Sequence, residues 1–320
     1  MSRLWLLTLL LLLGGCAERS PPLQVGGNDW LGYQPFFLAA EFQLFGEGVQ
    51  LQHQPSSLHT LRAFREGALD VALMTLDEAL LLAESGQPMC IPLVMSYSNG
   101  ADSLLAHEPL DSLAALAGRR IGVEDTGVGA HMLARVLEQG GLTLGDIQLV
   151  PLTLDETESA FLERRVDAVI TFEPLRSRLL AQGGHELYNS AAIPGEISDL
   201  LVVNPEILQR EPLRFARLLD GWFAALALLE AEEPEAMAWL QRRTELDEPS
   251  LQQSLRLIQF HSLGMNLALQ SNSQHPFRQT MRQLNEVMLE RQVIGSRQPV
   301  NRLICGASAA MLYPVSRGGL

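Results

Sequence analysis

Two aromatic residues on either side of a glycine are the first residues with the character of a binding site. Trp30, Gly32 and Tyr33 follow a short apolar strand expected at 23–25. They precede a helix that Pro35 can open, because the first helical turn needs no N–H at that position. Such a loop lies at the carboxyl end of a strand, where open α/β sheets bind ligands. The pattern predicts ligand contacts; ordinary packing at the rim of a core is the alternative.

Polar groups also stand near the ends of other expected strands. Tyr97 and Ser98 follow an apolar run, in what we expect to be a loop. Thr126 and Gly127 separate a strand from a helix, where free backbone N–H groups can hold a negative or strongly polar ligand group. Alternatively, Asp125 simply caps that helix.

Three more strand ends carry a hydroxyl or a carboxylate. Thr75 closes an apolar strand, and Phe172 and Glu173 close another before Pro174, which disfavours helix at Glu173. Asp199 opens the strand by which the chain returns to its first half. Each carboxylate borders an apolar run rather than a solvated helix face, which favours binding over the role of a surface acid.

No set of residues in the chain predicts catalysis, a metal site or a cofactor. The seven His are scattered, without His-Glu-x-x-His spacing, and there is no Gly-x-Ser-x-Gly elbow. All 23 basic residues are Arg, so a P-loop lysine, a lysine Schiff base and a Ser-x-x-Lys site are excluded. Gly127 and Gly129 lack the third glycine of a dinucleotide fingerprint. We therefore expect a protein that is not an enzyme and has no catalytic residues, metal or cofactor.

The composition indicates an exported protein that does not bind nucleic acid. The 320 residues are 47% hydrophobic, enough for one large or two medium cores, and the formal net charge of −14 argues against a basic face. Residues 1–15 read as a signal peptide, with Arg3 before an apolar run and small residues before Cys16. The stretch ending at Cys16 resembles a bacterial lipobox, which implies acylation of Cys16 and a tether over 16–22. A plain secretory signal is the alternative.

The elements that position these groups alternate between strand and helix up to about residue 203, and the chain is helical beyond residue 212. Strands are expected at 49–52, 69–74, 91–95, 104–106 (extending the strand before it), 121–123, 147–151, 166–172, 185–188 and 200–203. Helices are expected at 131–137, 155–164, 236–242, 251–260 and 277–291, among others.

Two segments echo each other, at 64–75 and 161–171. Each has a Phe, a charged turn, an Asp six residues on and an apolar strand that ends in Thr. Similar α/β units suggest two lobes that face one another across a cleft, where ligand sites concentrate. Chance similarity is the alternative.

Two cysteines lie beyond the leader. Cys90 sits in the apolar run 89–95, so we expect Cys90 and Cys305 to be inert buried thiols. A disulfide between them is the alternative, since exported proteins form such bonds.

Several of these motifs, taken in order, resemble one family. Trp30-x-Gly-Tyr-x-Pro, the Asp125-Thr-Gly loop, the run Asp-Ala-Val-Ile-Thr-Phe-Glu-Pro at 167–174 and the lipobox look like the NitT/TauT (SsuA/TauA, NMT1-like) substrate-binding proteins of ABC importers. The resemblance covers about residues 23–230, and the order of the motifs is more specific than any one of them.

The resemblance implies an α/β chain with a type II periplasmic-binding-protein fold, two α/β lobes with a ligand cleft between them. Its expected parts are lobe I at 22–102 and 200–305, lobe II at 103–199 and a C-terminal tail at 306–320. Carried over by position, the expected ligand contacts are Trp30, Gly32, Tyr33, Thr75, Tyr97, Ser98, Thr126, Gly127, Phe172, Glu173 and Asp199.

The expected ligand departs from the sulfonates and nitrate bound by some members, because those anions need hydrogen-bond donors. The strand ends offer few Arg and many acids, namely Asp77, Glu78, Glu124, Asp125, Glu173 and Asp199. Carboxylates beside aromatic rings favour a cationic group or a hydrogen-bonding heterocycle. Members that bind thiamine-precursor pyrimidines fit this chemistry better, although the cysteine-rich motif of the related pyrimidine-making enzymes is absent.

The resemblance therefore implies a periplasmic or extracytoplasmic solute-binding lipoprotein, monomeric and anchored to a membrane through Cys16. It would close around a small polar solute and deliver it to ABC permease and ATPase subunits. A sulfonate or nitrate stays open as the solute. The alternatives are a ligand-sensing module for a membrane receptor kinase or cyclase and, less favoured, a pyrimidine-related enzyme of the same fold.

Overall fold

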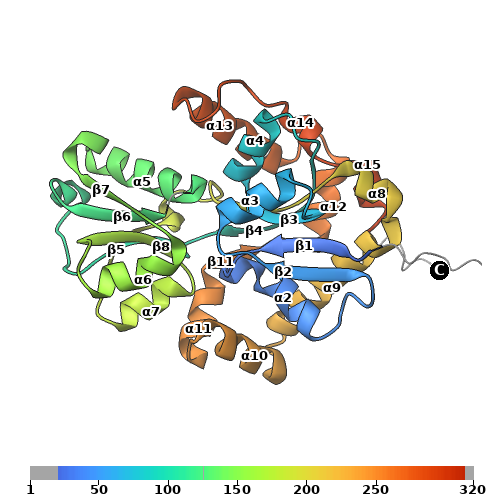
Figure 1. Ribbon diagram of the computed structural model, residues 1–320, viewed down its shortest axis with the longest axis horizontal. Helices are drawn as coiled ribbons and strands as arrows, with labels where there is room; N and C mark the ends of the chain where they lie inside the picture. The colour runs from blue at the N-terminus through green and yellow to red at the C-terminus, as the bar shows by residue number, and fades with distance from the viewer. Residues whose placement is uncertain (1–20, 125, 314–320) are drawn as a thin grey trace, which may run out of the picture.

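The computed structural model describes residues 21–124 and 126–313. Its strands form two separate sheets, each with helices packed against it (Figure 1). We call the part built on the six-stranded sheet the large lobe and the part built on the five-stranded sheet the small lobe. The predicted signal peptide and Cys16 lie outside the described residues.

The large sheet has the strand order β11-β4-β10-β3-β1-β2, and β10 and β11 run antiparallel to their neighbours. Its strands are β1 (Leu23–Gly27), β2 (Val49–His53), β3 (Val71–Thr75), β4 (Cys90–Ser98), β10 (Ser198–Val203) and β11 (Ile258–Phe260). Its helices are α2 (Gln34–Glu41), α3 (Ser57–Arg65), α4 (Leu76–Glu84), α8 (Pro205–Arg210), α9 (Pro212–Glu230), α10 (Pro234–Thr244), α11 (Glu248–Arg256), α12 (Leu263–Ser271), α13 (Pro276–Glu290), α14 (Val300–Leu303) and α15 (Ala307–Ala310).

The small sheet has the order β7-β6-β8-β5-β9, with β5 antiparallel to both neighbours. Its strands are β5 (Asp102–Ala106), β6 (Arg120–Glu124), β7 (Gln148–Leu152), β8 (Ala168–Phe172) and β9 (His185–Asn189). Its helices are α5 (Gly127–Gly140), α6 (Leu154–Leu162) and α7 (Leu175–Ala181). The described residues also include short 3₁₀ helices at Leu31–Tyr33, Leu113–Leu116, Leu144–Asp146 and Ser190–Ala192.

The two echoed segments occupy equivalent places in the two lobes. Asp70 precedes β3 and its Oδ2 accepts a hydrogen bond from the Gln24 N–H of β1 at 2.9 Å. Asp167 precedes β8 and its Oδ2 accepts from the Arg120 N–H of β6 at 2.8 Å. In both lobes an Asp side chain thus links the start of one strand to the parallel strand beside it, β3 to β1 in the large lobe and β8 to β6 in the small lobe.

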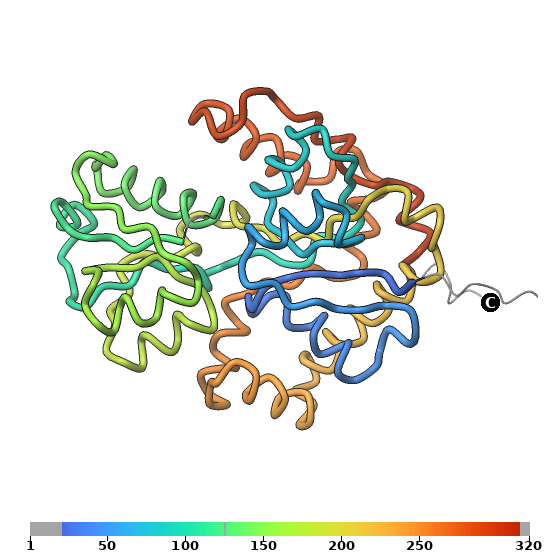
Figure 2. Tube along the Cα trace, in the orientation of Figure 1, coloured from blue at the N-terminus to red at the C-terminus, as the bar shows by residue number. Residues whose placement is uncertain are grey.

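The chain crosses between the lobes twice, after β4 and again before β10 (Figure 2). The Ser98 and Ser190 hydroxyls are 2.6 Å apart, and the Gly100 N–H donates to the Ser190 Oγ at 2.8 Å. Since Ser98 and Ser190 flank different crossings, these bonds tie the two crossings together.

Three sequence-based boundaries are corrected by pairing between distant segments. Strand β4 continues to Ser98, where a loop was expected, because Tyr97 pairs with Ser198 and Ser98 with Ile258. The end of the helix expected at 251–260 is strand β11, and the strand expected to extend β4 is β5 of the other sheet.

The described C-terminal residues also differ from expectation. Cys90 and Cys305 form a disulfide, so they are not the free thiols that the apolar surroundings of Cys90 favoured. Residues 307–310 form α15, and Tyr313 is fully buried in the large lobe with its hydroxyl donating to the Pro92 carbonyl. The expected tail is therefore packed as far as the structure describes it. Within residues 21–124 and 126–313, no helix has both the length and the apolar character needed to cross a bilayer.

Candidate functional site

A small cavity of about 30 Å³ lies between the lobes, where strand ends from both sheets meet. Parallel strands contribute their carboxyl ends to it, and the antiparallel strands β5 and β10 contribute their amino ends. The lining residues are Asn28, Trp30, Tyr33, Ser57, Thr75, Asp102, Glu124, Thr126, Val128, Phe172, Ile197 and Asp199.

The structure brings some of the predicted contacts to this cavity and leaves others away from it. Those that line it are Trp30, Tyr33, Thr75, Thr126, Phe172 and Asp199. Those that do not are Gly32, Tyr97, Ser98, Gly127 and Glu173. The residues of the second group have structural roles, which the sequence alone did not distinguish from ligand contact.

Asp199 is held from two sides. The Trp30 indole N–H donates to its Oδ2 at 3.0 Å, and the Ser96 hydroxyl donates to the same oxygen at 2.6 Å. The Trp30 ring also meets Phe172 of the small lobe edge to face, with ring centroids 5.6 Å apart. Gly32 makes this placement possible, because a Cβ there would lie 2.2 Å from the Trp30 Nε1. The glycine between the aromatics is therefore needed for packing.

Three carboxylates surround the cavity, from the buried Asp102 and Asp199 and the half-buried Glu124. Burial raises the pKa of each to about 7, because the charged form loses its hydration. At Asp102 the nearby Asp199 and Asp77 charges raise the pKa further, whereas the Ser98 hydroxyl opposes the shift. The Asp102 Oδ2 and Glu124 Oε1 are buried without a hydrogen-bond partner. Such atoms are satisfied by a hydrogen-bond donor from water or from a ligand.

The threonines that end the echoed strands differ in their surroundings. The Thr171 hydroxyl on β8 is buried and lacks a hydrogen-bond partner, whereas the Thr75 side chain on β3 forms a capping box with Glu78 at the start of α4. Only Thr75 lines the cavity. The Thr126 hydroxyl instead caps α5 by accepting from the Gly129 N–H at 3.2 Å. The alternative cap, Asp125, lies outside the described residues.

Next to the cavity, α4 of the large lobe abuts the start of α5. A Cβ on Gly127 would lie 1.9 Å from the Asp77 Oδ2, so Gly127 is required for this close approach between lobes. Burial raises the pKa of Asp77, and burial together with the Asp77 charge raises that of Glu78 to about 8. The Glu78 Oε2 accepts from the Thr75 N–H at 2.9 Å.

Glu173 does not present its carboxylate to the cavity. Its side chain is fully buried and accepts from the Arg176 Nη1 at 2.9 Å and the Ser177 Oγ at 2.8 Å. Its backbone carbonyl accepts from the Leu31 N–H of the large lobe at 3.3 Å. Ser98 is part of the crossing described above, and Tyr97 packs edge to face on His261.

Six lining residues were not among the predicted contacts, namely Asn28, Ser57, Asp102, Glu124, Val128 and Ile197. Asp102 carried a usable signal, since it is an acid that directly precedes an apolar strand. Ser57 and Ile197 carried none, because only the meeting of loops from distant parts of the chain brings them to one place.

The ionisable side chains that line the cavity are all acidic. Among the residues that the structure describes, none that line the cavity is Arg, Lys or His. The nearby Arg176 is occupied by Glu173 and by Glu186, the latter at 2.6 Å. Within the described ranges, no group of three or more His, Cys, Asp or Glu is arranged to hold a metal ion.

Solved structures support the predicted two-lobed fold. The alkanesulfonate-binding protein SsuA from Xanthomonas axonopodis pv. citri, solved with MOPS bound, is 17% identical, with a TM-score of 0.75 over 88% of this chain and 97% of that chain. The desulfurization enzyme DSZB is 15% identical, with a TM-score of 0.66 over 91% of this chain and 98% of that chain. The predicted type II periplasmic-binding-protein fold is thereby confirmed.

Sequence comparison places the chain in a family. A putative aliphatic sulfonates-binding protein of Escherichia coli (strain K12) is 22% identical over 197 residues, which cover 61% of this chain and 62% of that protein. The chain thus aligns with less than two thirds of the length of that relative. The model of the NMT1-like family matches residues 17–241, well over half of the chain. The chain therefore belongs to the NMT1-like family.

Proposed function

We propose that this protein is the substrate-binding component of an ABC importer and that its solute is a small cation or a donor-bearing heterocycle. Membership of the NMT1-like family and the two-lobed fold support the first part. The carboxylates of the cavity support the second. The relatives named for sulfonates make an anionic solute the competing candidate.

One observation carries the choice of solute: the cavity is lined by three carboxylates and no basic side chain. Like charges at close range raise one another's pKa, and a bound cation relieves that repulsion. A sulfonate would face the same carboxylates with a charge of the same sign. The unpartnered Asp102 Oδ2 and Glu124 Oε1 are acceptors, which an ammonium or an amino-heterocycle can satisfy and a sulfonate cannot.

The contacts between lobes support a closing mechanism. Around the cavity, the Leu31 N–H bonds the Glu173 carbonyl, and the hydroxyls of Ser177 and Ser254 are 3.0 Å apart. A ligand that touches Asp199 on one lobe and Glu124 on the other binds only the closed form fully. Its differential affinity would shift the open–closed balance. We infer that residues 22–102 and 200–305 move as one lobe against 103–199.

We further propose that the protein is lipid-anchored through Cys16 and acts outside the cytoplasm, delivering solute to permease and ATPase subunits without changing it. Relatives that are named as binding proteins support a role in binding without catalysis. Because DSZB is an enzyme of similar fold, recovery of unchanged ligand after incubation is the direct check.

The proposal is tested by calorimetry on the purified protein with ligand pairs that differ only in the head group. Butylamine against butanesulfonate compares charge, and 4-amino-2-methylpyrimidine represents the heterocycles. Binding of the amine or the aminopyrimidine, with no heat from the sulfonate, is the expected result. Preference for the sulfonate would overturn the assignment of solute class.

A further inference from the structure

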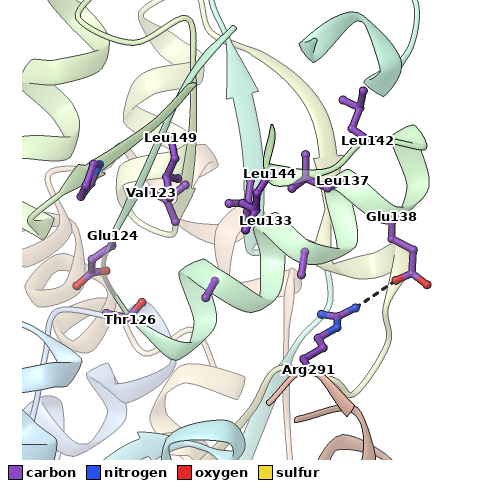
Figure 3. A pocket seen from close by; sticks show the side chains of 13 residues that line it. Val123, Glu124, Thr126, Leu133, Leu137, Glu138, Leu142, Leu144, Leu149 and Arg291 are labelled. Carbon is purple, nitrogen blue, oxygen red and sulfur yellow. Dashed lines mark hydrogen bonds and ion pairs between the residues drawn. The ribbon is translucent and has the colours of Figure 1, made fainter. Parts of the chain in front are cut away.

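A second, larger hollow lies on the small lobe and is not explained by the cavity between the lobes. It has a volume of about 560 Å³ and follows α5 (Figure 3). Its walls are apolar and include Val123, Leu133, Leu137, Leu144 and Leu149. Leu144 and Leu149 are 62% and 48% exposed. Contiguous exposed apolar surface in a concave site is typical of a binding surface.

The groove arises from the edge of the small sheet. Strand β7 is the outermost strand, so its Leu149 has no further strand beside it. Helix α5 turns Leu133 and Leu137 inward against the sheet, and the turn at Leu144–Asp146 stands between helix and edge strand. The space between α5 and β7 is left open as a channel.

This groove lies next to the cavity. Glu124 and Thr126 line both of them. Figure 3 places these two residues at one end of the groove and the Glu138–Arg291 ion pair, 3.4 Å, at the other. From Thr126 to Leu137 the helix rises roughly 16 Å, at 1.5 Å per residue. A cationic head on the Glu124 carboxylate therefore has an apolar path of that length directly behind it.

We propose that the solute is amphiphilic, with its cationic head in the cavity and an unbranched apolar tail along the α5–β7 groove. This inference rests on the proposed function, which supplies the cationic head group of the solute, and it adds the apolar tail. The sharing of Glu124 and Thr126 by the two spaces favours the solute's own tail over a separate molecule or a protein partner. Arg291 belongs to the large lobe and Glu138 to the small lobe, so closure of the lobes also bounds the far end of the groove.

The test is a chain-length series of n-alkylamines, from ethylamine to octylamine, titrated calorimetrically at pH 8. Each methylene group buried in the groove should raise affinity up to about fourfold throughout the series, because an octyl chain is shorter than the groove. Leu149→Ser should lower the ratio of octylamine to ethylamine affinity at least about tenfold. Leu162→Ser is the matched control: Leu162 is 47% exposed on the same lobe but lies outside the groove.

The outcomes separate the tail from the head group. Amine binding that does not depend on chain length, or an equal loss in Leu162→Ser, overturns the tail and leaves the proposed function standing. A chain-length dependence seen with n-alkanesulfonates and not with amines supports the groove and overturns the cationic head. No binding in either series overturns both the head group and the tail. Octylamine that binds without competition from ethylamine refutes a shared ligand and indicates a separate occupant of the groove.

Discussion

The titration of the cavity carboxylates gives the sharpest test of solute class. Asp102, Glu124 and Asp199 have pKa values raised to about 7, so at neutral pH each is partly protonated in the ligand-free protein. An alkylammonium ligand stays charged throughout this range and requires ionised partners. Its binding must therefore release protons, and its affinity must fall as the pH is lowered.

The magnitude follows from those pKa values. Between pH 8 and pH 6, a carboxylate of pKa 7 goes from about nine-tenths to about one-tenth ionised. Amine affinity should fall about tenfold for each linked carboxylate, and up to about a hundredfold for two. A sulfonate does not titrate here, so its affinity should rise as the carboxylates become neutral. The two solute classes thus predict slopes of opposite sign.

Asp102→Asn isolates one of these groups. Calorimetry at pH 6, 7 and 8 should show that the variant binds the amine more weakly than wild type at pH 8. The ratio of its amine affinities at pH 8 and pH 6 should be about tenfold smaller than that of wild type. The folded-state pKa is raised above the unfolded value, so Asp102 lowers stability as the pH rises through about 4 to 7. The variant should therefore melt at a higher temperature than wild type at pH 8. Amine affinity independent of pH, or a variant less stable at pH 8, would refute the reasoning.

Four further perturbations test the site and the anchor. Trp30→Phe removes the N–H that donates to Asp199, so amine affinity at pH 7 should fall about tenfold and partly recover at higher pH. An unchanged affinity would show that Trp30 only packs against its neighbours. Glu173→Gln breaks the buried ion pair with Arg176, so it should lower the free energy of unfolding in a denaturant titration by about 3 kcal/mol and change ligand affinity less than twofold. A tenfold loss of affinity without loss of stability would contradict this placement of Glu173. Gly127→Ala should block lobe closure, so that small-angle scattering shows no ligand-induced compaction, whereas Gly145→Ala, where a Cβ meets only ordinary contacts, should compact normally. Cys16→Ser should release the protein from membrane fractions, and persistent membrane association would refute the lipid anchor.

Much of the fold followed from local pattern. The helix–strand echo correctly indicated two similar units, because a Phe, a turn and an Asp before an apolar strand have the same local consequence in each lobe. The family resemblance was confirmed by the family match. Strand β11 was missed because Ile258–Phe260 is extended only through pairing with β4, some 160 residues away, and local propensity does not register such pairing.

The candidate site was only partly predictable. Trp30 and Phe172 were placed at the site because aromatic residues at strand ends are candidates for ligand contact, although the same residues can also pack at the rim of a core. Glu173 was assigned to ligand contact since a carboxylate beside an apolar run looks the same whether it faces a cleft or a buried Arg. The state of Cys90 and Cys305 was likewise open, because two cysteines bond only if the fold brings them together.

By itself the sequence determined the residue types: an excess of acids at strand ends, aromatics around a glycine, and no lysine anywhere. These residue types underlie the proposed positive charge of the ligand, and the lack of lysine excludes a P-loop lysine and a lysine Schiff base. Only the tertiary structure decided which acids share one cavity and which are neutralised elsewhere. The reason is physical: the pKa of a carboxylate and its freedom to bind depend on burial and on neighbours contributed by distant parts of the chain.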